Sequence, residues 1–231
     1  MTQIPFLNLS SILPIFFKFL PFAFSKESSD KNQESIKLPP PKFTGELSVE
    51  EAILKRKSVR EYKDESLTLG EISQLLWSAQ GIKGTIGFRT IPSAGALYPL
   101  EIYLLAGNVK DLPAGIYKYK TDTHKLTLIL KGDKRTDVCN ASLGQECVKD
   151  GAVVIIISAV YERTTKKYGQ RGLRYVLNEV GHTAQNIYLQ ATSLNLGTVL
   201  VGAFIDDKVK KILNLPDNEE PLGIMPIGKI R

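Results

Sequence analysis

The stretch AVVIIISA (residues 152–159) decides the fold class. It carries no charge, and five of its eight residues are valine or isoleucine. β-Branched residues favour strands, and a run without alternating polar positions is typical of a central strand that is covered on both faces. A sheet flanked by helices is therefore the expected frame of the domain.

The rest of the chain supplies those helices and further strands. Residues 49–57 and 68–81 each begin with an S/T-x-x-E capping box, and residues 175–194 form the longest helical pattern. Gly181 inside that pattern costs ~1 kcal/mol relative to alanine, which is easiest to understand if another helix or a ligand crosses there. Strands are expected at 100–106, 115–120, 125–130, 198–203 and 224–230. Helices and strands mix without a regular βαβ repeat, which predicts an α+β domain.

Composition limits the classes of function. The 231 residues suffice for one large domain or two small ones, and 43% hydrophobic with 23% charged residues is typical of a globular protein. The net charge of +6 favours anionic partners, but it is milder than expected for a dedicated nucleic-acid binder. Two cysteines and two histidines make a metal site improbable, so no metal is expected.

The N-terminus divides into two segments before the folded domain. Residues 1–25 are apolar and aromatic, but three prolines and a lysine interrupt them, and the basic start of a signal peptide is absent. A membrane-associating or signal-like leader, a segment packed on the domain or its dimer partner, and a disordered tail all stay open. We expect a Pro-rich linker at 26–46 and the folded domain at 47–231. The expected location is cytoplasmic, with membrane association or export through the leader as the alternative.

A basic cluster follows the first expected helix. Residues 55–60 contain four cations and one hydroxyl. A phosphate monoester suits them, because arginine offers forked donors, lysine a point charge and serine a short hydroxyl donor. A solvated basic helix end, favourable to the helix dipole, explains the same residues. A second candidate is the loop RTIPSAGALYPLE (89–101), whose small residues leave room for a flat ring.

Five motifs in this order form a more specific signal: RKSVR, PSAGALYP, GH-x-x-QN, GTVLVGAF and PIGK. Together they resemble the nitroreductase-like flavoprotein superfamily. PSAGALYP and KYGQRGLRY followed by EVGHTAQN resemble its SagB-type branch, the thiazoline/oxazoline dehydrogenases, as a stand-alone member. The resemblance covers about residues 47–229. It implies a nitroreductase-like fold with a central mixed or antiparallel sheet, and an obligate homodimer that holds FMN between its subunits.

The resemblance also implies residue roles. Arg56, Lys57 and Ser58 would grip the FMN phosphate, and Arg60 would face the pyrimidine edge of the ring, where a cation stabilises the reduced flavin. A backbone N–H near Val201 or Gly202 would face flavin N5. Lys229 would be a second phosphate cation. The loop that closes over the ring from the other subunit would be Pro92, Ser93, Ala94 and Gly95.

Lys167 and Tyr168 align with a Lys-Tyr pair that acts as base on the azoline ring in the dehydrogenase branch. A lysine whose pKa is lowered by burial or by nearby cations can remove a carbon-bound proton while hydride leaves for flavin N5. An ordinary surface lysine is the alternative.

The implied function is an FMN-dependent oxidoreductase with a ping-pong cycle. Either NAD(P)H reduces the flavin and a nitroaromatic or quinone re-oxidises it, or a small-molecule or peptide heterocycle of the azoline type supplies the hydride and oxygen re-oxidises the flavin. A non-enzymatic basic module that binds nucleic acid or an anionic membrane remains the competing hypothesis at this stage.

Overall fold

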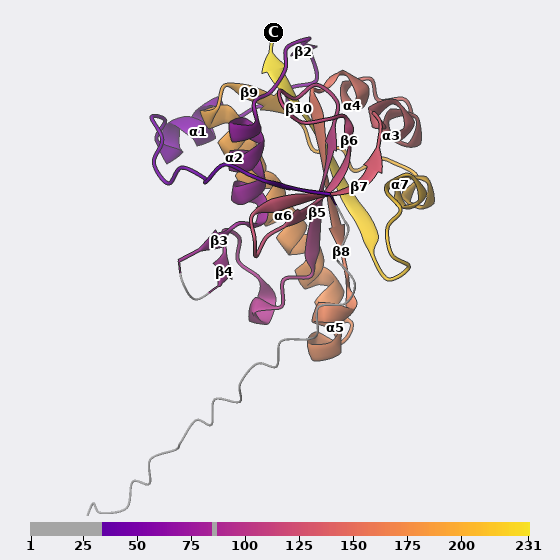
Figure 1. The fold of residues 1–231 in the computed structure, drawn as a ribbon. Helices are drawn as coiled ribbons and strands as arrows, with labels where there is room; N and C mark the ends of the chain where they lie inside the picture. Colours follow the sequence, from indigo (N-terminus) through magenta and orange to yellow (C-terminus); the bar gives the residue numbers. More distant parts are fainter. Residues whose placement is uncertain (1–33, 85–86) are drawn as a thin grey trace, which may run out of the picture. The chain divides into compact units, whose positions relative to one another are not determined.

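The uncharged run forms strand β8 (Val153–Ala159), in which every residue is buried. β5 (Leu100–Ala106) and β10 (Glu220–Ile230) flank it, and both pair with it in antiparallel orientation. This computed structural model describes residues 34–84 and 87–231, and the leader expected at 1–25 lies outside them. Figure 1 shows the sheet almost edge-on, with helices on both sides.

The main sheet has the strand order β1-β7-β6-β5-β8-β10-β2, and β9 pairs with β10 beside that path. Each of its ladders is antiparallel, and a separate hairpin joins β3 to β4. The remaining strands are β1 (Ser35–Lys37), β2 (Tyr62–Lys63), β3 (Ile82–Lys83), β4 (Phe88–Arg89), β6 (Gly115–Lys120), β7 (Lys125–Lys131) and β9 (Leu196–Thr198).

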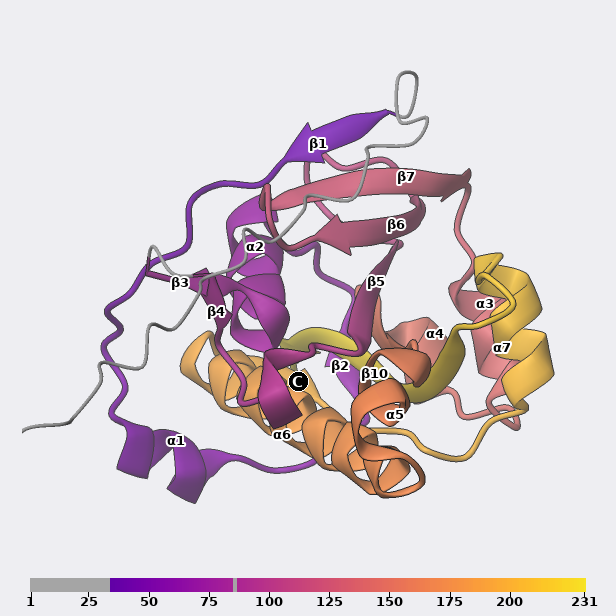
Figure 2. The ribbon, with the colours of Figure 1, turned by 90° about the horizontal axis from the view of Figure 1, so that it is seen from below.

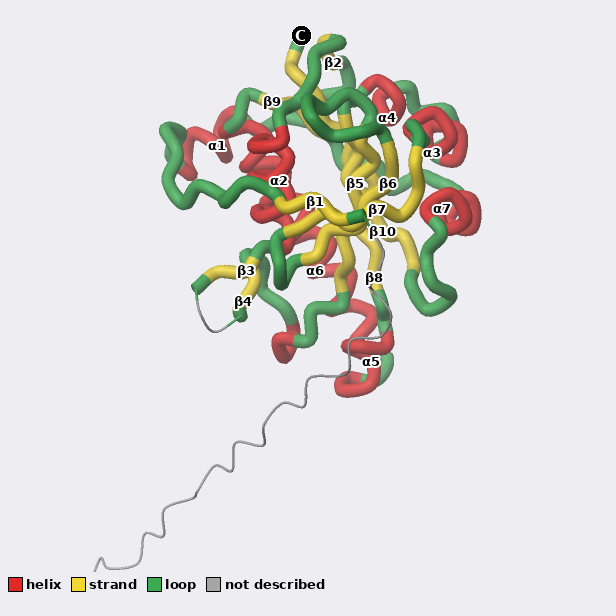
Figure 3. The backbone as a smooth tube through the Cα atoms, viewed as in Figure 1, coloured by secondary structure: helices red, strands yellow, loops and turns green. Residues whose placement is uncertain are grey.

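Two helical layers cover the sheet, and each buries a core of its own (Figure 3). Along β8, Ile155 and Ile157 belong to the core on one face, and Ile156 belongs to the core on the other, because successive strand residues point to opposite faces. Helices α2 (Leu69–Gln80) and α6 (Arg171–Ser193) bury the first core. The second core is buried by α3 (Arg135–Ala141), α4 (Cys147–Asp150) and α7 (Asp206–Leu213).

The expected α+β class, with an antiparallel sheet flanked by helices, is thereby confirmed. Both predicted capping boxes are present, at the start of α1 (Val49–Lys55) and of α2. α1 is shorter than expected, because Arg56 already adopts an extended backbone with φ −57° and ψ 126°. α1 and α5 (Glu162–Tyr168) lie near opposite ends of α6 (Figure 2).

The expected linker differs from the structure in its second half. β1 lies within residues 26–46 and pairs with β7, and Leu38 after it is only 2% exposed. Leu38 donates its N–H to the His124 carbonyl at 3.1 Å, and the His124 ring lies 3.0 Å from the Pro39 carbonyl. Pairing with β7 satisfies the hydrogen-bonding groups of the backbone there. The polar composition of the segment gives no sign of this pairing. None of the helices in the described ranges has both the length and the apolar character needed to cross a bilayer.

Candidate active site

The basic motif leaves α1 as an extended segment that runs beside β9. Ser58 forms an isolated parallel bridge with Thr198, and the Val59 N–H donates to the Thr198 carbonyl at 2.9 Å. This pairing brings the basic motif next to the segment that follows β9, although the two are far apart in the sequence. Two of the sequence motifs therefore meet at one place in the fold.

Tyr188 of α6 joins these segments. Its hydroxyl lies 3.2 Å from Ser58 Oγ and accepts the Leu200 N–H at 2.7 Å. The Arg56 guanidinium carbon is 5.3 Å from the centre of its ring, in a cation–π contact. Tyr188 therefore links the basic motif to the segment after β9. The sequence analysis missed this residue, because nothing in a helical pattern marks a tyrosine that bridges distant loops.

The segment after β9 contains the two backbone N–H groups, of Val201 and Gly202, that were expected to face the flavin. They differ in whether the protein itself uses them. Val201 donates its N–H to the Ile224 carbonyl at 2.8 Å, so that N–H is not available to a ligand. Gly202 is exposed, and a Cβ built on it meets no atom within 4 Å. Within residues 34–84 and 87–231, its N–H donates to no protein acceptor. Of the expected pair, the structure therefore excludes Val201 as a free donor and leaves Gly202.

The other expected phosphate ligands differ in their surroundings. Lys57 and Arg60 are exposed. Arg60 lies close enough to Tyr62 for its charge to oppose the rise in pKa that burial imposes on that phenol. Lys229 pairs with Glu71 at 2.5 Å, so its charge is already neutralised.

Glu71 also closes the capping box of α2. Burial alone would raise the pKa of Glu71, but its hydrogen bonds from Lys229 and Thr68 outweigh burial and hold that pKa below its usual value. Structurally, Lys229 ties β10 to the start of α2. Its expected role as a second phosphate cation competes with this ion pair.

The ring-facing loop lies elsewhere, between β4 and β5, where the short 3₁₀ helix η1 (Ala94–Ala96) forms. Ser93 Oγ and the Ala94 N–H both donate to Oε1 of Glu179 on α6, each at 3.0 Å. Pro92 precedes this turn and is exposed. Glu179 is a second residue that the sequence analysis missed, since its position in the helical pattern carries no sign of the loop above it.

Lys167 and Tyr168, at the end of α5, meet this loop within the same chain. A Cβ built on Gly95 would lie 2.8 Å from the Tyr168 hydroxyl and 3.0 Å from Lys167 Nζ. Tyr168 is fixed by an edge-on contact with Tyr175, with ring centres 5.1 Å apart. Glycine at position 95 thus lets the Lys-Tyr pair approach the backbone closely.

The candidate residues fall into two groups along α6. We call Arg56, Ser58, Tyr188 and Gly202 the basic half-site, and Ser93, Ala94, Gly95, Lys167, Tyr168 and Glu179 the loop half-site. Glu179 and Tyr188 are more than two helical turns apart, or about 13 Å along the axis. Figure 2 shows α1, which precedes the basic motif, and α5, which carries Lys167 and Tyr168, near opposite ends of α6.

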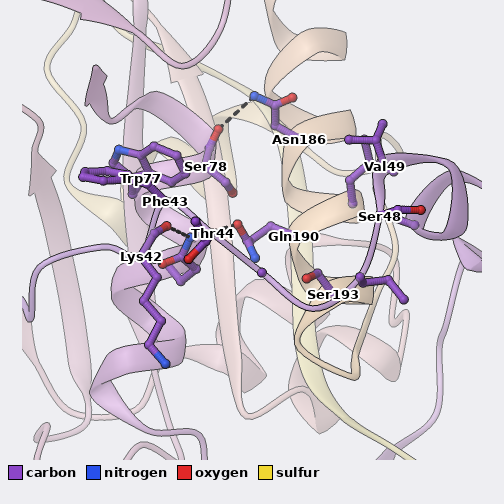
Figure 4. A pocket seen from close by; sticks show the side chains of 15 residues that line it. Lys42, Phe43, Thr44, Ser48, Val49, Trp77, Ser78, Asn186, Gln190 and Ser193 are labelled. Carbon is purple, nitrogen blue, oxygen red and sulfur yellow. Dashed lines mark hydrogen bonds between the residues drawn. The ribbon is translucent and has the colours of Figure 1, made fainter. Parts of the chain in front are cut away.

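A cavity of about 290 Å³ lies between residues 42–49, α1, α2 and α6 (Figure 4). It is close to the basic half-site, because its lining includes Ala52, whose carbonyl accepts the Arg56 N–H at 2.9 Å. Phe43 and Trp77 form an aromatic wall with ring centres 5.5 Å apart. Its amide groups are already paired: Asn186 donates to the Ser78 carbonyl at 3.0 Å, and Gln74 donates to Gln190 at 3.1 Å. None of the residues of either half-site lines it. Among the described residues, no group of His, Cys, Asp and Glu side chains could hold a metal ion.

Comparison with known proteins identifies the class. The model of the Nitroreductase family matches residues 53–229, and the chain belongs to this family. The match includes both half-sites and nearly the whole sheet. An oxidoreductase of this family is thus the class that fold and sequence define.

Three known proteins are similar to this chain over much of its length. A protein of Methanocaldococcus jannaschii, provisionally named a nitroreductase, is 48% identical over 184 residues, which cover 80% of this chain and 92% of that protein. McbC of Escherichia coli, a microcin B17-processing protein, is 30% identical over 148 residues, covering 62% of this chain and 54% of McbC. A solved structure from Ralstonia eutropha, also provisionally named a nitroreductase, has a TM-score of 0.76 at 25% identity and covers 99% of both chains. The chain is thus similar both to a protein named for nitroreductase activity and to a protein named for microcin processing.

Proposed function

We propose that this protein is an FMN-dependent oxidoreductase with a ping-pong cycle. The basic half-site carries the proposal, because it gathers donors of the kind that the cofactor requires. Arg56 and Ser58 would hold the phosphate as charged and neutral donors, with Lys57 and Arg60 beside them. The open space above Gly202 would admit a flat ring, and its unused N–H would donate to N5. Bound FMN would supply a two-electron hydride acceptor and donor.

The complete site in this proposal is shared by two chains. Glu179 and Tyr188, one in each half-site, lie about 13 Å apart along α6, and in this proposal a second copy of the chain places its loop half-site over the basic half-site of the first. A second chain would contribute Pro92, Ser93, Ala94 and Gly95, and the Lys-Tyr pair that contacts this loop would come with it. Each site would then combine Arg56 and Ser58 of one chain with Lys167 and Tyr168 of the other.

The outer surface of α6 supports a homodimer. Leu173 is 41% exposed and Leu177 is 54% exposed, and both lie on one stripe with exposed Gly181. A Cβ on Gly181 would meet nothing within 4 Å among residues 34–84 and 87–231, so no contact there explains the glycine. A second helix crossing at Gly181 would account for its helix penalty and for the exposed leucines, since small residues allow close backbone approach.

Two substrate classes fit this site. One is NAD(P)H, with a nitroaromatic or quinone as acceptor. The other is an azoline-type heterocycle, which would give a hydride to the flavin and a proton to a base, with oxygen re-oxidising the flavin. On the second route, Lys167 would take the carbon-bound proton while Tyr168 fixes its position. The similarity to McbC, over 62% of this chain, supports this second route.

The Lys167→Ala variant separates these routes. We expect it to lower dehydrogenation of an azoline substrate by roughly 10²- to 10⁴-fold, because a general base is lost. Oxidation of NAD(P)H with a quinone should stay within about twofold, because that route needs no such base. The matched control is Lys166→Ala, which removes a neighbouring exposed lysine paired with Glu162 at 3.3 Å. Steady-state rates with both substrate pairs provide the measurement, and equal losses in both variants would contradict the role of Lys167.

Purification and anaerobic reduction test the general proposal. The protein should carry an absorption band near ~450 nm, or gain it with added FMN. Under anaerobic conditions, either NAD(P)H or an azoline peptide should bleach that band. A colourless protein that takes up no FMN would refute the proposal and leave the basic-module hypothesis.

A further inference from the structure

The ring-facing turn has an unusual backbone. Gly95, Ala96 and Tyr98 adopt positive φ values of 63°, 54° and 45°. Residues with a Cβ rarely adopt this region, so Ala96 and Tyr98 are under local strain. Such conformations persist only where surrounding contacts hold them.

One carboxyl oxygen holds the start of the turn directly and its end through Ser93. Glu179 Oε1 accepts from Ser93 Oγ and from the Ala94 N–H. Ser93 Oγ in turn accepts the Tyr98 N–H at 2.9 Å, so the same serine closes the strained segment. Arg163 of α5 donates to the Tyr98 carbonyl at 3.1 Å, which ties the turn to the helix that carries Lys167.

The second oxygen of Glu179 has no such task. Glu179 is 2% exposed, and its Oε2 lacks a hydrogen-bond partner among the described residues. Burial raises the pKa of Glu179 above its usual value, although the bonds from Ala94 and Ser93 and the charges of His182 and Arg89 oppose that rise. A protonated carboxyl would carry its proton on Oε2 and keep both bonds at Oε1. An ionised carboxylate makes the same two bonds stronger, because charge-assisted hydrogen bonds are roughly twice as strong as neutral ones.

We propose that Glu179 is a positioning residue whose carboxyl group fixes the Ser93–Tyr98 turn, and thereby the place of Gly95 against Lys167 and Tyr168, with a hold that tightens when the carboxyl ionises. The link to catalysis rests on the proposed function, but the shape of the turn does not. The charged groups that face this carboxyl are His182 on α6 and Arg89 on β4. Arg163 on α5 reaches the turn at Tyr98.

Hydrogen exchange in the protein without FMN tests this role. The Ala94 and Tyr98 amides are followed between about pH 5 and 8, and their rates are corrected for the intrinsic dependence of exchange on pH. In the unmodified protein, protection should rise roughly three- to tenfold as the carboxyl ionises. Glu179→Gln should keep the protection found at low pH and lose the rise, because the amide oxygen still accepts both bonds. Glu179→Ala should lose at least about tenfold protection at all pH values.

A matched control variant and a titration with FMN distinguish failure of the Glu179 proposal from failure of the proposed function. Glu162→Gln, an exposed carboxylate on α5, should behave like the unmodified protein. If Glu179→Gln shows the same pH-dependent rise as the unmodified protein, the proposal is overturned even when Glu179→Ala fails to fold. If the unmodified protein binds no FMN, the proposed function fails, while the exchange data still decide whether Glu179 holds the turn. A rise confined to chains with an ionisable Glu179 supports the proposal.

Discussion

Replacing Arg56 by alanine is expected to weaken FMN binding by roughly 10- to 100-fold, because a hydrogen bond to a charged group contributes about 1.5–3 kcal/mol. The Arg56 guanidinium is held in place over the Tyr188 ring, so little ordering is needed when a phosphate binds. Titration of the protein with FMN, followed through quenching of flavin fluorescence at fixed ionic strength, measures the change.

The control for this prediction is the neighbouring cation. Lys55 is exposed and pairs with Glu51 at 3.5 Å, one helical turn away. Lys55→Ala should change the affinity for FMN by less than about twofold, because exposed ion pairs contribute little. Equal losses in the two variants, with a steep dependence on salt, would indicate general attraction to a basic surface rather than a built phosphate site.

Replacing Leu177 by arginine is expected to abolish the dimer and, with it, the bound flavin. In the proposed interface this residue lies under a second copy of α6, so the new charge would be buried without a partner. Such a charge destabilises an interface by about 3–5 kcal/mol. Sedimentation with detection at both protein and flavin wavelengths shows mass and cofactor together. Loss of both in one step is the predicted result.

Leu143→Arg provides the matched control. Leu143 is 66% exposed and follows α3 in the chain, before α4. Both of these helices cover the opposite face of the sheet from α6 (Figure 1). The same leucine-to-arginine change there should leave the dimer and the flavin intact. A Leu177→Arg protein that remains dimeric and yellow would show that the interface uses another surface.

Features with a local cause could be predicted from the sequence. The capping boxes fixed the starts of α1 and α2 because Ser48 and Thr68 bond a glutamate three residues on. The uncharged run of β8 indicated a strand buried on both faces. Beyond these local features, the family resemblance implied that RKSVR and the segment after β9 serve one site, and in the structure both segments contact Tyr188.

Features that depend on contacts between distant parts of the chain could not be predicted from the sequence. Tyr188 and Glu179 occupy ordinary helical positions, and their partners are loops that the chain reaches only after folding. Lys229 pairs with Glu71, which is far from it in the sequence, and the residues next to either one do not indicate this ion pair. β1 is a short edge strand in polar sequence, and its pairing depends on β7. Nothing local distinguishes the N–H of Val201, which the sheet uses, from that of Gly202.

The central claim is that each site takes its basic half-site from one chain and its loop half-site from the other. The most direct test mixes two variants that each lose FMN as homodimers: Arg56→Ala with Ser58→Ala, and Gly95→Trp, whose side chain would collide with Lys167 and Tyr168. After unfolding and refolding of the mixture, half of the dimers are mixed and one of their two sites is intact. Roughly a quarter of the FMN-binding sites of the unmodified protein should therefore be recovered. Refolded mixed dimers that bind no FMN, although the unmodified protein treated in the same way does, would place both half-sites in one chain and contradict the account.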